Sequence, residues 1–131
     1  PLKDLYKTKV YEVVEWRNQL IQHEFLGPKG RVVPENIITK APTAELRENQ
    51  KDQDTLPPYH ILDQILERLL EQKQGVEEIV AAGFDPAVVN KVRSLLYGSE
   101  YKRFQSPPGV KLTDTLLGYD RRFPIVNGFK G

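Results

Sequence analysis

Apolar residues recur in this chain with the spacing of amphipathic helices, and that spacing leaves little room for a sheet. The most regular stretch, residues 59–74, has a single apolar stripe made of Ile61, Leu62, Ile65, Leu66, Leu69 and Leu70. Nowhere do short apolar runs alternate with helices as a βαβ unit requires. A parallel sheet cannot be built from this sequence alone, so we predict a mostly helical chain with little strand.

Residues that start and stop helices divide this pattern. We predict helices over residues 4–23, 35–38, 59–74, 76–82 and 86–97, and a last helical turn over 99–103. Asp4 and Asp85 are the expected N-caps of the first and the fifth, because a carboxylate accepts the free N–H groups of a first turn. Gly75 and Gly83 are expected to end the third and the fourth. Residues 110–131 show no periodicity, and we expect an extended surface segment there.

Between residues 40 and 58 the apolar pattern disappears. A run of this length without structure is normally either a functional loop or a disordered one. Its hydroxyl, carboxylate and guanidinium groups suit a mobile loop that closes over a phosphorylated substrate and holds Mg²⁺, and they are carried by Thr43, Glu45, Arg47, Asp52 and Asp54. Composition leaves both outcomes open.

Charge and composition weigh against several classes of function. The 19 basic and 18 acidic residues give a net charge of +1, which is too balanced for a protein that holds nucleic acid by bulk charge. No stretch approaches the roughly 20 apolar residues of a membrane span. There is no Cys, and the two His are far apart, so we assign no metal-binding residues. The absence of Cys fits a reducing compartment.

Two places carry cations in settings that suit a phosphate. Lys7 lies near the start of the first predicted helix, where its charge adds to free backbone N–H groups. In the run Tyr101, Lys102 and Arg103, cations stand beside an aromatic ring, so a cation can hold a phosphate while the ring packs on a base or ribose. From the residues alone, a solvated surface group is the commoner explanation for each.

A nucleic-acid function has one candidate, the two helices on either side of the sequence GFDP. This arrangement resembles a helix-turn-helix, whose second helix would need Lys91 and Arg93 to face outward. That helix begins with Pro-Ala-Val-Val and offers few side chains able to read bases. We therefore interpret the pair as core packing.

Three stretches resemble segments of the NAD⁺ synthetases, in the same order and at similar separation. They are DLYKTKVYEV, KAPTAELRENQKDQDTLPPYHILDQIL and EYKRFQSPPGVKLTDTLLGYDRRFPIVN. The resemblance covers nearly the whole chain and favours bacterial glutamine-dependent members. It implies that residues 1–131 are the C-terminal part of the synthetase domain, with residues 40–58 as a mobile active-site loop. The parent fold would then be an α/β Rossmann-like domain of the adenine nucleotide alpha hydrolase type, like the N-type ATP pyrophosphatases.

The resemblance also implies a ligase. Family members use ATP and Mg²⁺ to adenylate the carboxylate of deamido-NAD⁺, and ammonia then displaces AMP to give NAD⁺. In glutamine-dependent members a glutaminase domain supplies the ammonia. The resemblance further implies a cytoplasmic homo-oligomer, with no nucleic-acid or membrane partner.

By resemblance, Lys7 and Thr43 match positions that contact ATP, and Tyr101 and Lys102 match the pair that contacts deamido-NAD⁺. The family's Ser-Gly-Gly-x-Asp-Ser phosphate loop and its Mg²⁺-binding acidic residue are absent from this sequence. We therefore expect the chain to bind substrate without catalysing the reaction alone, and no catalytic residue is assigned. A helical interaction or dimerisation module, and part of an ammonia-dependent single-domain synthetase, are the alternatives.

Overall fold

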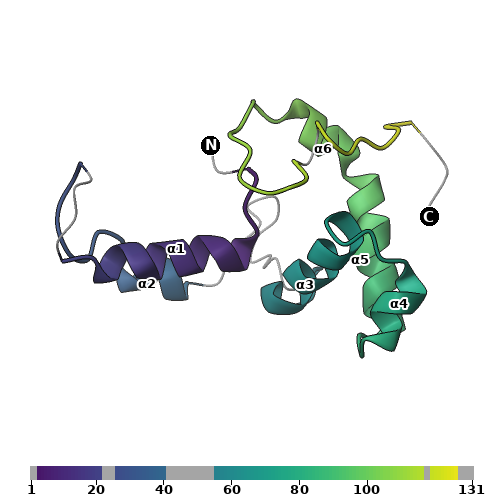
Figure 1. Ribbon diagram of the computed structural model, residues 1–131, viewed down its shortest axis with the longest axis horizontal. Helices are drawn as coiled ribbons and strands as arrows, with labels where there is room; N and C mark the ends of the chain where they lie inside the picture. The colour runs from purple at the N-terminus through teal and green to yellow at the C-terminus, as the bar shows by residue number, and fades with distance from the viewer. Residues whose placement is uncertain (1–2, 22–25, 41–54, 117–118, 127–131) are drawn as a thin grey trace. The chain divides into compact units, whose positions relative to one another are not determined.

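The computed structural model describes residues 3–21, 26–40, 55–116 and 119–126, which fall into two compact units (Figure 1). Unit 1 combines Pro1–Leu5 with Pro57–Gly131, and unit 2 is Tyr6–Leu56. Every regular element within the described ranges is a helix. The prediction of a mostly helical chain is confirmed for those residues.

The core of unit 1 lies where three helices pack against one another: α3 (Tyr59–Leu70), α4 (Val76–Ala81) and α5 (Pro86–Gly98) (Figure 1). Its fully buried side chains are Ile65, Leu70, Ile79, Val89 and Val92. Burying an aliphatic side chain of this size contributes about 1.5–3 kcal/mol. The predicted stripe of α3 therefore faces this core, and the core fixes α5 in place.

The start of α5 follows the prediction. The Asp85 carboxylate accepts hydrogen bonds from the backbone N–H groups of Ala87 (2.7 Å) and Val88 (3.2 Å), as an N-cap does. Val89, Val92 and Leu96 of this helix are buried, whereas Leu95 is 37% exposed. The predicted last turn is a separate short helix, α6 (Glu100–Gln105), which packs against α5.

The end of α3 differs from the prediction. The helix stops at Leu70, four residues early, and Lys73 rather than a glycine takes the left-handed backbone conformation, with φ of 56°. Gly75 has φ of −75° and is the N-cap of α4, where its N–H donates to the Glu78 carboxylate at 2.7 Å. The prediction that Gly75 ends α3 was wrong, because the turn is closed two residues earlier. Gly83, with φ of 99°, follows α4 as predicted.

Asp4 is not the N-cap of the first helix. Helix α1 (Lys7–Gln19) has Tyr6 at its N-cap position and no side-chain cap. The buried Asp4 carboxylate instead accepts hydrogen bonds within unit 1 from the N–H groups of Leu112 (2.5 Å) and Thr113 (2.8 Å) and from the Thr113 hydroxyl (3.0 Å). The prediction failed because distant donors compete with the nearby helix for this carboxylate.

The segment after α6 is not simply the extended surface segment that we predicted. Leu116 is buried, and the Lys3 ammonium donates to the Ser106 hydroxyl at 2.9 Å. The Arg121 guanidinium donates to the carbonyl oxygen of Leu69 (2.6 Å), a group that the end of α3 leaves free. Side chains without any periodic spacing thus hold the described part of this segment onto unit 1.

In unit 2, polar side chains of α1 hold the chain that leads to α2 (Glu35–Thr39). The Asn18 side chain accepts from the N–H groups of Val32 and Val33 and donates to the Val33 carbonyl, each at 2.9 Å. No α1 side chain is buried among the described residues, and Trp16 is 53% exposed. The predicted helix up to residue 23 ends at Gln19, because the backbone is already extended at Leu20.

Candidate functional site

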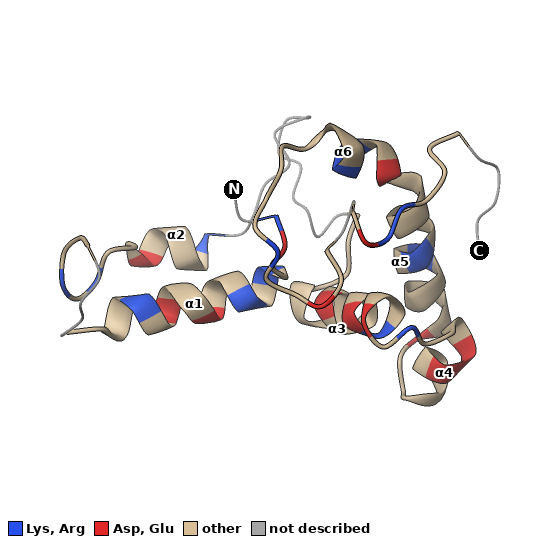
Figure 2. Ribbon diagram, turned by 45° about the horizontal axis from the view of Figure 1, so that its top comes forward, with Lys and Arg blue, Asp and Glu red and all other residues tan. Residues whose placement is uncertain are grey.

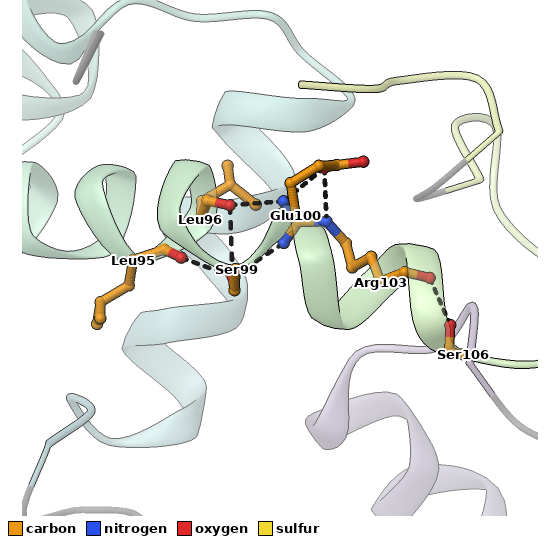
Figure 3. Close-up of polar contacts among 6 residues, drawn as sticks. All are labelled: Leu95, Leu96, Ser99, Glu100, Arg103 and Ser106. Carbon is orange, nitrogen blue, oxygen red and sulfur yellow. Dashed lines mark hydrogen bonds and ion pairs between the residues drawn. The ribbon is translucent and has the colours of Figure 1, made fainter. Parts of the chain in front are cut away.

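Helix α6 is fixed to the end of α5 by one guanidinium group (Figure 3). The Arg103 Nε and Nη2 atoms donate to one oxygen of the buried Glu100 carboxylate, at 3.1 and 2.8 Å. Nη2 also donates to the Leu96 carbonyl (2.6 Å), and Nη1 donates to the Ser99 hydroxyl (3.0 Å). We call Ser99, Glu100 and Arg103, together with the Leu96 carbonyl, the α6 brace.

The α6 brace continues into aromatic contacts. The Arg103 guanidinium carbon lies 6.0 Å from the centroid of the Phe123 ring, and that ring meets Tyr97 of α5 edge-on at 4.4 Å between centroids. The Ser106 hydroxyl donates to the Arg103 carbonyl at 2.7 Å, which closes the last turn of α6. The sequence carries one signal of the brace that we did not use, the i, i+3 spacing of Glu100 and Arg103.

Tyr101 and Lys102 lie on the exposed side of α6. Tyr101 is 45% exposed, and the Lys102 ammonium is 6.0 Å from the centroid of its ring. The Lys102 ammonium makes no hydrogen bond or ion pair with any residue that the structure describes. The predicted pair of ring and cation is therefore present. Arg103, the third member of the predicted run, is not part of it, because the α6 brace uses all three of its nitrogens.

The other predicted contacts lie elsewhere. Lys7 is the first residue of α1 in unit 2, and its ammonium lies 5.4 Å from the centroid of the Tyr11 ring. It therefore sits at a helix N-terminus, as we predicted. The predicted loop contacts are outside the residues that the structure describes, and these are Thr43, Glu45, Arg47, Asp52 and Asp54.

The acidic side chains of the described residues do not gather into a metal-binding cluster. Among them, no three His, Asp or Glu side chains gather as metal ligands would. Two of the buried carboxylates already have partners: Asp4 accepts hydrogen bonds from Leu112 and Thr113, and Glu100 accepts them from Arg103.

An exposed ion pair closes the loop that precedes residue 121. The Lys111 ammonium and an Asp120 oxygen are 2.6 Å apart, and the N–H of Leu116 donates to the same oxygen at 2.9 Å. The hydrogen bond from Lys111, followed by that from Leu116, lowers the pKa of Asp120, and the same bond to Asp120 raises the pKa of Lys111. Beside this pair is an open cavity of about 460 Å³, lined by Leu70, Lys73, Thr115, Asp120 and Arg121. None of the predicted site residues that the structure describes lines it.

The pair of helices α4 and α5 does not form a surface suited to DNA. Figure 2 shows acidic residues on α4, and Glu77 and Glu78 are both exposed in its first turn, where they would repel phosphates. The half-buried Arg93 of α5 donates to the Asn90 side chain at 3.1 Å. The interpretation as core packing is supported by the burial of Ile79, Val89 and Val92. Within the described ranges, no helix combines the length and the apolarity needed to cross a membrane.

Fold and site together define a helical protein segment that presents an aromatic ring and a cation from a braced helix, a surface that suits an anionic ligand with flat rings. A family model described as NAD synthase matches residues 1–106. The chain belongs to the NAD synthase family.

Individual proteins agree with the family. The chain is 56% identical over 130 residues to a protein named glutamine-dependent NAD(+) synthetase in Rhodobacter capsulatus, a match that covers 99% of the chain and 24% of that protein. It is 45% identical to a protein of the same name in Xanthomonas campestris pv. campestris (strain 8004), over 100% of the chain and 22% of that protein. The chain thus spans about a quarter of the length of these relatives or less.

A solved structure is also similar. It is the glutamine-dependent NAD⁺ synthetase from Acinetobacter baumannii in complex with adenosine diphosphate. The TM-score is 0.54 and the sequence identity 38%, and the match covers 97% of this chain and 20% of that one.

Proposed function

We propose that this chain is the C-terminal part of the synthetase domain of a glutamine-dependent NAD⁺ synthetase. The parent enzyme is then a ligase that amidates deamido-NAD⁺ to NAD⁺ with ATP and with ammonia from glutamine. The observation that carries this proposal is the 56% identity, over 99% of the chain, to a protein with that name. The alternatives, an interaction module and an ammonia-dependent synthetase, have no comparable support.

Within this function, Tyr101 and Lys102 bind deamido-NAD⁺. That substrate carries negative charge on its pyrophosphate and on its carboxylate, and it has flat rings. The Lys102 ammonium is exposed and has no polar partner among the described residues, so it can bind an anionic group of the substrate. The Tyr101 ring is half-exposed and can pack against one of the substrate's rings. Because α6 is braced, less ordering entropy is lost when a ligand binds there.

The reaction proceeds in two displacements. The carboxylate oxygen of deamido-NAD⁺ attacks the α-phosphorus of ATP and pyrophosphate leaves, and ammonia then attacks the acyl carbon and AMP leaves. The contribution of this chain is to hold the substrates in place, which accelerates a reaction between two bound groups. Lys7 and Thr43 are proposed to contact ATP, and the ligands of Mg²⁺ would come from outside the described residues.

The wider context follows from the same proposal. The helices would flank the Rossmann-like sheet of an α/β domain of the ATP pyrophosphatase type, and residues 40–58 would form an active-site loop. A glutaminase domain of the same parent protein would supply ammonia. The parent enzyme would be a cytoplasmic homo-oligomer.

The test is kinetic and uses the full-length enzyme. A hydrogen bond to a charged group contributes roughly 1.5–3 kcal/mol, so Lys102→Ala should raise the KM for deamido-NAD⁺ about 10- to 100-fold. The KM for ATP should not change. Lys91→Ala, which removes an exposed lysine from α5 of the same unit, is the matched control and should behave as wild type.

Two results would contradict the proposal. If wild-type enzyme forms no NAD⁺ from deamido-NAD⁺, ATP and ammonia, the proposed function is wrong. If Lys102→Ala leaves the KM for deamido-NAD⁺ unchanged, the assigned substrate site is wrong. Self-association of the chain without binding of either nucleotide would instead favour the interaction module.

A further inference from the structure

We infer that Arg103 is a positioning residue, which orients Tyr101 and Lys102 toward deamido-NAD⁺ without touching the substrate itself. This inference rests on the proposed function. The position of Arg103 beside Lys102 suggests a second phosphate contact, but we assign Arg103 a role within the protein instead.

Every nitrogen of Arg103 already has an acceptor within the protein, and four of its five N–H groups are used. Nε donates to Glu100, Nη1 to Ser99, and Nη2 to both Glu100 and the Leu96 carbonyl. The Arg103 side chain is only 16% exposed, and that of Glu100 only 5%. Breaking these bonds to reach a ligand would leave a buried carboxylate without its partner, which is strongly unfavourable. Arg103 therefore acts within the protein.

Helix α6 needs such a brace, because it cannot hold its own orientation. It has six residues and no side-chain cap at its N-terminus. Helices this short are not stable alone. The Leu96 carbonyl and Ser99 lie in the last turn of α5 and just after it, so the Arg103 bonds fix the angle between α5 and α6. That angle decides where the Tyr101 ring and the Lys102 ammonium lie.

The geometry also requires arginine. The planar guanidinium of Arg103 uses its three nitrogens to reach three acceptors, which are one Glu100 oxygen, the Leu96 carbonyl and the Ser99 hydroxyl. A lysine ammonium in the same place is a single point and cannot reach these acceptors together. Arg103→Lys should therefore keep the charge but only part of the orientation.

The experiment is a double-mutant cycle in the full-length enzyme, with Arg103→Gln and Lys102→Ala. We expect Arg103→Gln to raise the KM for deamido-NAD⁺ about tenfold, since a displacement of about 1 Å at a substrate contact can cost that much or more. The KM for ATP should stay the same, and Arg103→Lys should fall between wild type and Arg103→Gln. In the Lys102→Ala background, Arg103→Gln should raise the KM by clearly less than this factor, because the part of its effect that passes through Lys102 is already lost and only the part through Tyr101 remains.

Arg68→Gln is the matched control. Arg68 is a half-buried arginine of unit 1 that donates to Gln74 (3.1 Å) and packs over Phe84, so its loss should reduce stability without changing the KM. If Arg103→Gln reduces only stability, as Arg68→Gln should, the role of Arg103 is structural and the inference is wrong. Additive effects of Arg103→Gln and Lys102→Ala would also overturn it, since they would indicate a direct substrate contact. If Arg103→Gln does not fold, Arg103→Lys and Glu100→Gln carry the same KM test. An unchanged KM in Lys102→Ala alone would instead refute the assigned site of the proposed function.

Discussion

Replacing Asp4 with alanine should loosen the segment around residue 113 from the rest of unit 1. Asp4 is 5% exposed, and its carboxylate is the acceptor for the N–H groups of Leu112 and Thr113 and for the Thr113 hydroxyl. A buried donor that loses its acceptor costs roughly 1–3 kcal/mol. Leu112 is 52% exposed, so water replaces part of the lost bonding and the lower end of that range applies to each N–H group. We expect a total of about 2 kcal/mol, which corresponds to a roughly 30-fold increase in local opening.

Hydrogen–deuterium exchange of the full-length protein measures this opening directly. In Asp4→Ala, the amides of Leu112 and Thr113 should exchange about 30-fold faster than in wild type. Asp4→Asn should give a smaller increase, because its amide oxygen still accepts hydrogen bonds without the charge. Asp114→Ala removes an exposed carboxylate from the same loop and should leave exchange unchanged. Exchange in Asp4→Ala within about twofold of wild type would refute the assignment of Asp4 as the anchor of this segment.

Two further predictions concern unit 1. Asp85→Ala should destabilise the first turn of α5 by about 1 kcal/mol, because the helix loses its N-cap. The Ala87 amide should then exchange faster than in wild type, and equal exchange in wild type and Asp85→Ala would contradict this prediction. Because the pKa of Asp120 is lowered in the folded state, its carboxylate stabilises that state at pH values above the ordinary aspartate pKa of about 3.9. This contribution to stability disappears as the pH falls through the lowered pKa. Urea denaturation should therefore show wild type more stable than Asp120→Asn at pH 6 and a smaller difference at pH 3, whereas a constant difference would refute it.

The sequence predicted those parts of the fold that depend on neighbouring residues. Asp85 caps α5 because its acceptor lies two and three residues from the N–H groups that it binds. Asp4 carries the same carboxylate, but its donors lie 108 and 109 residues away, and no local rule identifies them. Lys73 shows a second limit. Glycine adopts a left-handed backbone at the least cost, so Gly75 was predicted to end α3. The chain instead adopts this backbone conformation at Lys73.

The candidate site was predictable to a similar extent. The adjacency of Tyr101 and Lys102 is visible in the sequence, and the structure keeps their ring and ammonium together. Sequence adjacency also grouped Arg103 with them, although one step along a helix turns the side chain to a different face. Only the partners of Arg103, which include a backbone carbonyl of the preceding helix, reveal that it faces inward.

The discontinuity of unit 1 has a consequence for biosynthesis. Lys3 and Asp4 emerge from the ribosome long before their partners, since Ser106 follows Lys3 by 103 residues and Thr113 follows Asp4 by 109. Closing a loop of about 100 residues costs about 2 kcal/mol more than closing one of about ten. The three-helix core, made of nearer neighbours, can therefore assemble on the nascent chain first, and these two residues join it only when translation has passed residue 113.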